Sequence, residues 1–307
     1  MFYEYAVEPQ AIAASWANFR YIIEKFGFDQ GRLIAEFPKR WLREVYDATI
    51  SLPPVQRKRV EEALNQARKN KLIRTGRPYN ESVGDWLQNA VVEHQRVPFR
   101  AIIANANPTN NRVVLAAAEL DESHPLMNVP HDQAVHRDAK SLAAAMKEIL
   151  EFSSRVVFID PFFDPFDSRY RATFRECLDI VRSFNPNAVC EIHYRYHNAK
   201  PANDAIEREA PHLFPGTFPN DLRVIIFCWR EKAGGEDFHD RYLLTERGGI
   251  AVGAGFSAEG AHQTTDMRLM SYELSQEKLK AFARGTTCYE LVEPVIRVAG
   301  NGQVERI

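Results

Sequence analysis

Long hydrophobic runs are missing from this sequence, and cysteines are few. No apolar stretch is long enough to span a bilayer, and the first residues lack the basic start and apolar core of a secretory signal. None of the four cysteines belongs to a Cys-x-x-Cys pair, which argues against a structural zinc site. Because Cys190 and Cys228 lie in apolar, strand-like runs, we expect buried free thiols and a cytoplasmic protein.

A large excess of charge of one sign is also missing. The formal charge of −2 at pH 7 does not favour nucleic-acid binding by the chain as a whole, but it leaves room for a local basic patch. The length of 307 residues suffices for two domains, and we predict domains over 1–135 and 136–307. Near this boundary the spacing of His124, His131 and His136 matches no metal-binding pattern. We therefore expect exposed loop histidines there, and neither a metal nor a cofactor.

The N-terminal domain is predicted to be mainly helical and to carry one β-hairpin. Apolar residues at helical spacing, together with capping and proline signals, predict helices over 11–26, 31–49, 55–70 and 81–94. Two strands are expected at 99–104 and 112–120. The linker between them is rich in asparagine, which favours a turn and hence a hairpin.

The predicted helix 55–70 and the residues after it are basic. Only Glu61 and Glu62 balance the cations of this segment. Such a run is compatible with an ordinary solvated face or with a surface that binds nucleic acid. The candidate nucleic-acid-binding residues are Arg57, Lys58, Arg68, Lys69, Lys71 and Arg74.

The second half alternates strand and helix. Strands are expected around 155–160, 188–195 and 222–229, with helices over 139–152, 169–184 and 204–213. Apolar strands separated by helices predict an α/β fold with a mixed, mostly parallel sheet flanked by helices on both faces. Ligands of such sheets collect beyond the carboxyl ends of the strands, where Asp160, His193 and Arg195 are placed. The alternatives are that Asp160 caps a loop and that His193 and Arg195 are ordinary strand-end residues.

The segment 238–257 carries the most informative pattern. His239 and Arg241 are two residues apart, so on a strand they share one face. Glu246 to Gly249 resembles a turn, and a short strand returns toward Gly255 and Ser257. A histidine that can attack phosphorus or donate a proton, beside an arginine that can hold phosphate oxygens, suits chemistry on a phosphate ester. The alternative is a buried structural histidine bonded to Asp160 or Glu246.

This pattern resembles the active-site motif of the phospholipase D superfamily, and the resemblance covers residues 140–275. That motif has His-x-Lys, then Asp, then a Gly-Ser segment, whereas this chain has Arg241, Glu246 and a shifted segment from Gly253 to Ser257. The chain is more similar to a degenerate single-motif branch, which includes the C-terminal domains of microtubule-interacting-and-trafficking proteins. The Ile-Asp-Pro-Phe run ending at Phe162 also resembles that branch, for which phospholipid binding without catalysis is implied.

The resemblance implies roles for the motif residues. In the catalytic family His239 would be the nucleophile, with Arg241, Glu246 and Asp160 completing the catalytic set. The implied phosphate-binding residues are Arg195, His193, Gly255 and Ser257. Family enzymes need two motifs that face each other, so a single-motif chain is expected to act as a homodimer.

Three functions follow as hypotheses. The first is a metal-independent phosphodiesterase, namely a nuclease that acts through a histidine nucleophile, as in a bacterial defence or antiphage toxin effector. The second is a non-catalytic module that binds the phosphate of a phospholipid headgroup, nucleotide or nucleic acid. The third is an interaction protein with a vestigial pocket. The Arg241 guanidinium favours binding at least as much as turnover, because it holds phosphate but does not release a proton.

Overall fold

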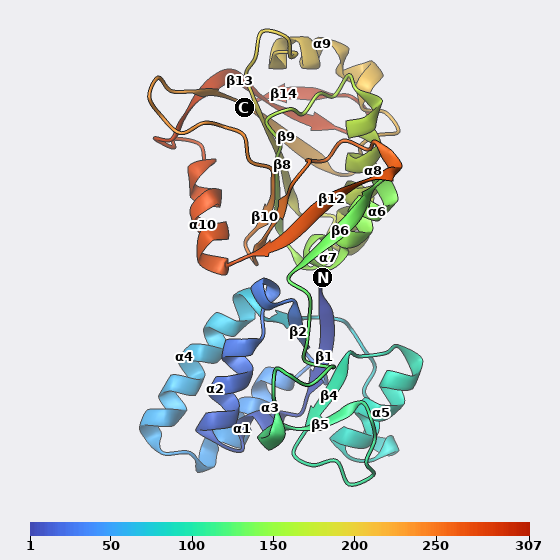
Figure 1. Cartoon of the computed structure of the whole chain (residues 1–307), viewed down its shortest axis with the longest axis vertical. Helices are drawn as coiled ribbons and strands as arrows, with labels where there is room; N and C mark the ends of the chain where they lie inside the picture. The colour runs from blue at the N-terminus through green and yellow to red at the C-terminus, as the bar shows by residue number, and fades with distance from the viewer. The chain divides into compact units, whose positions relative to one another are not determined.

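The computed structural model describes residues 1–307, apart from the side chain of Ser51. Two compact units divide the chain between His131 and Asp132. The predicted boundary lay a few residues later, after residue 135. The shift has a simple reason: residues Asp132–Arg137 form strand β6, which pairs with the sheet of the second unit. Each unit has its own sheet and is described by itself (Figure 1).

The first unit is built on a five-stranded parallel sheet with the order β3-β2-β1-β4-β5. Side chains of β1 alternate between two buried clusters, so helices cover both faces of this sheet. Tyr5 and Val7 point into the cluster beneath α1 to α4, and Ala6 points into the one beneath α5. The strands are β1 Tyr3–Val7, β2 Arg32–Ala35, β3 Leu72–Ile73, β4 Ala101–Ala104 and β5 Val114–Ala116.

The helices of this unit begin where the sequence offers caps or prolines. Ser15 caps α2, and Asp85 with Gln88 forms a capping box at the start of α5. Proline occupies the first turn of α1 and of α4. The α-helices are α1 Pro9–Ala13, α2 Trp16–Lys25, α3 Trp41–Ala48, α4 Pro54–Asn70 and α5 Trp86–Arg96. Short 3-10 helices are η1 Phe28–Gln30, η2 Thr49–Ser51, η3 Glu81–Val83 and η4 Ala117–Glu119.

Two predictions for this unit are wrong. The helix expected over 31–49 begins only at Trp41, because residues Arg32–Ala35 form a fully buried strand whose short apolar run has no readable period. The expected hairpin is absent from the described backbone, since β4 and β5 run parallel with Ile102 opposite Val114. In the loop between β4 and β5, the Asn107 side chain donates hydrogen bonds to the carbonyls of Asn111 and Val114, which holds the loop in a compact turn. The unit is therefore α/β rather than mainly helical.

The second unit holds a nine-stranded mixed sheet with the order β14-β13-β9-β8-β7-β10-β11-β12-β6. The three central strands β7, β8 and β9 are parallel, and the remaining neighbours pair antiparallel. The predicted α/β unit with a mixed sheet and a parallel centre is confirmed, but the prediction that the sheet is mostly parallel is wrong. The strands are β6 Asp132–Arg137, β7 Arg155–Ile159, β8 Val189–Arg195, β9 Arg223–Glu231, β10 Tyr242–Thr245, β11 Gly249–Val252, β12 Gly260–Met270, β13 Tyr289–Ala299 and β14 Val304–Arg306.

Helices lie on both faces of this sheet, as Figure 1 shows for α8 and α10. Along β7 the side chain of Phe158 packs against Phe174 of α8, with ring centroids 4.9 Å apart. The neighbouring Ile159 points to the other face and joins the cluster that contains Leu279 of α10. The helices are α6 Ala139–Ala145, α7 Lys147–Phe152, α8 Ser168–Phe184, α9 Asn203–Leu213 and α10 Tyr272–Ala281.

Candidate functional site

One edge of the second sheet gathers most of the residues that the sequence singled out. The parallel strands β7, β8 and β9 all end at this edge, and antiparallel β10 starts there, with Tyr242 opposite Ile159. Chain direction thus brings together side chains from four strand ends. We call them the edge cluster, which consists of Asp160, Phe162, Arg195, Glu231 and Arg241.

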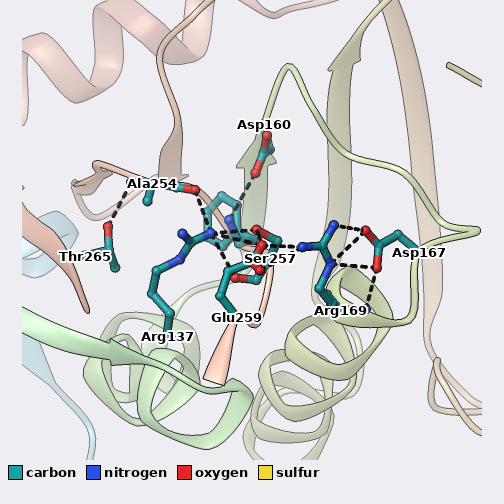
Figure 2. Close-up of polar contacts among 9 residues, drawn as sticks. Arg137, Asp160, Asp167, Arg169, Ala254, Ser257, Glu259 and Thr265 are labelled. Carbon is teal, nitrogen blue, oxygen red and sulfur yellow. Dashed lines mark hydrogen bonds and ion pairs between the residues drawn. The ribbon is translucent and has the colours of Figure 1, made fainter. Parts of the chain in front are cut away.

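Asp160 is the buried centre of the edge cluster. Its Oδ1 accepts the backbone N–H of Phe162 at 2.9 Å, and its Oδ2 accepts that of Phe256 at 3.0 Å. Burial raises the pKa of Asp160 above its ordinary value, while the two N–H donors and the nearby Arg241 oppose that rise. The carboxyl group therefore ties the end of β7 to the segment after β11, and Figure 2 shows it beside that segment. The loop-capping reading of Asp160 is correct, and the residue also lies next to a cation.

Gly255 allows the Asp160 carboxyl group to lie close to the backbone after β11. Its φ of +80° is in the left-handed region that favours glycine. A Cβ atom there would lie 2.5 Å from Asp160 Oδ2 and 3.1 Å from Arg241 Cδ. Gly255 therefore permits the close packing of a carboxyl group, a guanidinium stem and a backbone turn.

Two arginines share one aromatic ring at the surface of the edge cluster. The guanidinium carbons of Arg241 and Arg195 lie 4.7 Å and 5.5 Å from the ring centroid of Phe162. Arg241 Nη1 donates to the carbonyl of Gly253 at 3.0 Å, and Arg195 Nη1 pairs with Glu231 Oε1 at 3.0 Å. Phe162 is itself 36% exposed. The arrangement holds two fixed cations beside an accessible ring, which suits an anionic ligand that carries a planar or apolar group.

His239 borders the edge cluster and faces solvent. Its side chain is 60% exposed, and Nε2 lies 3.3 Å from Asp237 Oδ2. The N–H of Phe238, the residue before His239, donates to Glu231 Oε1 at 2.7 Å, which places His239 beside the edge cluster. That hydrogen bond and the ion pair with Arg195 hold the pKa of Glu231 below its ordinary value. The reading of His239 as a buried structural histidine is wrong.

Glu246 lies at the opposite end of the sheet from Asp160. Since β10 runs antiparallel to β7, its last residue, Thr245, pairs with Val156 near the start of β7. The Glu246 carboxylate accepts the backbone N–H groups of Ser154 and Arg155 at 2.7 Å and 3.0 Å. Strands advance about 3.3 Å per residue, so this carboxylate is more than about 10 Å from the edge cluster. The catalytic role predicted for Glu246 is not compatible with that position.

His193 is a core residue. Trp229 Nε1 donates to its Nδ1 at 2.9 Å, and its Nε2 lies 3.0 Å from a carboxylate oxygen of Glu191. The ring is fully buried and stacks on Phe227 with centroids 4.5 Å apart. Burial lowers the pKa of His193, while the hydrogen bond to Glu191 opposes that change. Because both ring nitrogens have protein partners and no surface is exposed, the phosphate contact predicted for His193 is wrong.

Ser257 belongs to a neighbouring polar network that the sequence did not reveal (Figure 2). Its hydroxyl accepts from Arg137 Nη2 at 2.7 Å and donates to Glu259 Oε1 at 3.2 Å. Arg169 in turn donates to both oxygens of Glu259 at 2.7 Å and also pairs with Asp167. These contacts tie the start of α8 and the end of β6 to the loop after β11. Ser257 is thus mainly occupied within the protein, and no local motif marks Arg137, which is 120 positions away in sequence.

The basic residues of the first unit differ in availability. Lys58, Arg68 and Lys69 of α4 are exposed, whereas Arg57 is half-buried over the ring of Tyr46. Lys71 Nζ donates to the carbonyl of Phe26 at 2.6 Å, and Arg74 Nε lies 3.3 Å from Glu36 Oε2. Glu61 and Glu62 are also exposed on α4, so two acids lie between its two groups of cations. Nucleic-acid binding by α4 stays a prediction.

The predictions for the cysteines and for the loop histidines can be compared with the structure. Cys190 and Cys228 are buried free thiols, as predicted. His124, His131 and His136 are exposed, although His136 lies in β6 and not in a loop. Over the part of the chain that the structure describes, no group of three or more His, Cys, Asp and Glu side chains could hold a metal ion. Within the same residues, no helix has the length and apolar character needed to cross a membrane.

Comparisons with known proteins add little to this site. No protein-family model and no curated protein matches the chain. One solved structure with some likeness is that of TrmBL2, an archaeal chromatin protein with a novel mode of DNA binding. The two chains are 12% identical, and the likeness covers 54% of this chain and 55% of that one, about half of each. At a TM-score of 0.30 it carries no argument about the fold or the function of this protein.

Proposed function

We propose that the edge cluster binds the phosphate group of a phosphodiester ligand, on a degenerate phospholipase D-like unit. The observation that carries this proposal is the pair of guanidinium groups over Phe162, at the edge where the parallel strands end. Guanidinium groups bind phosphate oxygens in a fork, and Arg241 is held in place by the Gly253 carbonyl instead of by a carboxylate. The buried Asp160 carboxyl lies near the Arg241 stem, but the guanidinium itself donates to a carbonyl and can still take phosphate oxygens.

Binding fits the geometry better than turnover does. Glu246 caps the far end of the sheet, so the acid of the resembled motif is missing from the edge cluster. Arg241 stands in the position of the motif lysine and keeps its proton at neutral pH. The burial that raises the pKa of Asp160 also keeps that carboxyl from solvent. These features favour a site that holds a phosphate and leaves its ester bonds intact.

Hydrolysis is a second candidate, favoured by the exposed ring of His239 beside Asp237. The imidazole nitrogen would attack phosphorus and form a phosphohistidine while the bond to the leaving oxygen breaks. That oxygen needs a proton from a second group, and water then releases the phosphate. Two copies of the chain that face each other would supply the second histidine. A nuclease of this kind would be a homodimer and would need no metal.

Equilibrium binding in EDTA tests the main proposal. The full chain is titrated with a fluorescent oligonucleotide and, separately, with vesicles that carry a phosphatidylinositol phosphate. Arg241→Gln should weaken binding of the preferred probe about tenfold to a hundredfold, as expected when a charged hydrogen bond is lost. The matched control is Arg268→Gln, which removes an exposed cation from β12 of the same unit. Equal affinities for Arg241→Gln and wild type would overturn the proposal.

Turnover is measured in the same EDTA solutions. Cleavage of the oligonucleotide that disappears in His239→Ala would establish the second candidate. Mixing His239→Ala with wild type then tests the dimer, because mixed dimers that share one site should lose activity beyond simple dilution. Binding without cleavage would leave the non-catalytic function.

A further inference from the structure

The loop after β7 contains the same turn twice. Asp160-Pro161-Phe162 is followed, four residues on, by Asp164-Pro165-Phe166. In each copy the aspartate Oδ1 accepts the backbone N–H of the phenylalanine, at 2.9 Å and 3.0 Å. In each copy the aspartate carbonyl also accepts an N–H three residues later at 3.1 Å. Aspartate in the first position and proline in the second are the residues that favour such turns.

The two turns present their phenylalanines to solvent in the same way. Phe162 is 36% exposed and Phe166 is 43% exposed, whereas both prolines are buried. Phe163, between the two turns, is buried against Phe174 with ring centroids 5.2 Å apart. The rings are therefore held outward by an anchored, hydrogen-bonded backbone and are not left outside by a loose loop. Two outward phenylalanines held by the same hydrogen-bonded turn, a few residues apart, form a repeated aromatic feature that Phe184 at the end of α8 lacks.

Positive charge accompanies these rings. Arg195 and Arg241 lie over Phe162, and Lys200 Nζ is 3.5 Å from Asp164 Oδ2 at the base of the second turn. Arg171 Nη1 donates to the carbonyl of Pro165 at 2.6 Å, which places another cation at that turn. Aromatic faces flanked by arginines are the features by which proteins bind single-stranded nucleic acid, because every base has a face that can stack.

We infer that Phe162 and Phe166 are stacking platforms for bases of a single-stranded nucleic acid whose phosphate is held by Arg241 and Arg195. This inference rests on the proposed function and names its ligand class. A double helix does not fit, because its bases are stacked on each other and their faces are covered. A lipid headgroup would use the arginines but would leave two rigid aromatic faces without a partner.

The test separates stacking from phosphate binding. The full chain is titrated with fluorescent oligothymidylate and with an abasic oligonucleotide of the same length, which has the same phosphates but no bases. Phe166→Leu should weaken binding of oligothymidylate about tenfold and leave the abasic affinity unchanged. Phe162→Leu should weaken binding of oligothymidylate by more than it weakens binding of the abasic probe, because the Phe162 ring also contacts Arg195 and Arg241. Phe184→Leu is the matched control, since Phe184 is 53% exposed at the end of α8 in the same unit. Its effect should stay below about twofold, the range of ordinary surface substitutions.

Each other outcome is decisive. If both leucine variants bind oligothymidylate as wild type does while Arg241→Gln does not, stacking is overturned and the proposed phosphate site stands. If wild type binds vesicles that carry a phosphatidylinositol phosphate more tightly than oligothymidylate, the ligand class is overturned and phosphate binding stands. If wild type binds none of these probes, the inference and the proposed function both fall. Near-ultraviolet circular dichroism of each variant confirms that it is folded.

Discussion

Replacing Gly255 by alanine should destabilise the second unit by far more than an ordinary glycine-to-alanine change. A residue with a side chain in the left-handed region costs about 1–2 kcal/mol. The new Cβ would also lie 2.5 Å from Asp160 Oδ2, so the carboxyl group must move away from the N–H of Phe256. Leaving that buried donor unpaired costs about 1–3 kcal/mol more. We expect a total loss of about 2–5 kcal/mol.

A matched control separates the two contributions. Gly285 has a φ of +86°, close to the +80° of Gly255, and a Cβ atom added there would have no atom within 4 Å. Gly285→Ala therefore carries the conformational cost of about 1–2 kcal/mol without a steric clash. The stiffening of the unfolded chain is the same in both variants and cancels in their difference. The excess loss in Gly255→Ala measures the contact with Asp160.

Native-state hydrogen exchange of the β7 and β8 amides is the suitable assay. It reports the opening free energy of the second unit and does not require the two units to unfold together. Gly255→Ala should lower protection by at least about 1 kcal/mol more than Gly285→Ala does. The same change should weaken phosphodiester binding, because Arg241 Cδ lies 3.1 Å from the new methyl position. Equal losses in the two variants would refute the close packing of Gly255, Asp160 and Arg241.

Three further predictions concern groups outside the edge cluster. Glu246→Gln should lower the melting temperature, because the carboxylate accepts two backbone N–H groups at the start of β7. It should leave ligand affinity unchanged. A variant that keeps its stability but loses binding would contradict this prediction. Burial alone would raise the pKa of Glu191. The hydrogen bonds from His193 and Arg155 outweigh this effect and lower the pKa from 4.5 to about 2. That depressed pKa supplies stability above about pH 4.5 that is lost as the pH falls toward about 2. Urea midpoints measured across this range should depend less on pH in Glu191→Gln, and an unchanged slope would count against the pairing. The third prediction concerns the exposed cations Lys58, Arg68 and Lys69 of α4. If each contacts a phosphate, replacing all three by glutamine should reduce the slope of log affinity against log salt concentration by about 2. An unchanged slope would exclude α4 from the nucleic-acid interface.

Local sequence signals predicted the elements that carry the site. The strands at β7, β8 and β9 and the return from β10 to β11 were found from apolar runs and from the glycines after Glu246. The strand-end rule placed Asp160, His193 and Arg195 at one edge, which is right for the chain positions, although the His193 side chain is buried. Arg241 was found from the pattern of residues 238–257. These features depend on residues close together in the chain, which is why they could be read.

Features that depend on chain direction and on distant contacts could not be read. Glu246 was assigned to the site from the motif resemblance, which gives its order along the chain but not its position at the far end of β10 from Arg241. The short buried strand β2 has no period that separates it from a helix. The position of His193 at a strand end does not show that Trp229, from another strand, occupies one of its nitrogens. Arg137 meets Ser257 only through the pairing of β6 with β12.

The central claim is that Arg195 and Arg241 together hold a phosphate at the edge of the second sheet. The most direct measurement is nuclear magnetic resonance of the arginine side-chain Nε–H groups during titration with oligothymidylate in EDTA. The signals of Arg195 and Arg241 should shift together and saturate at the same ligand concentration, while that of Arg268, on β12, stays in place. Saturable binding that shifts other arginines and leaves these two unchanged would contradict the account.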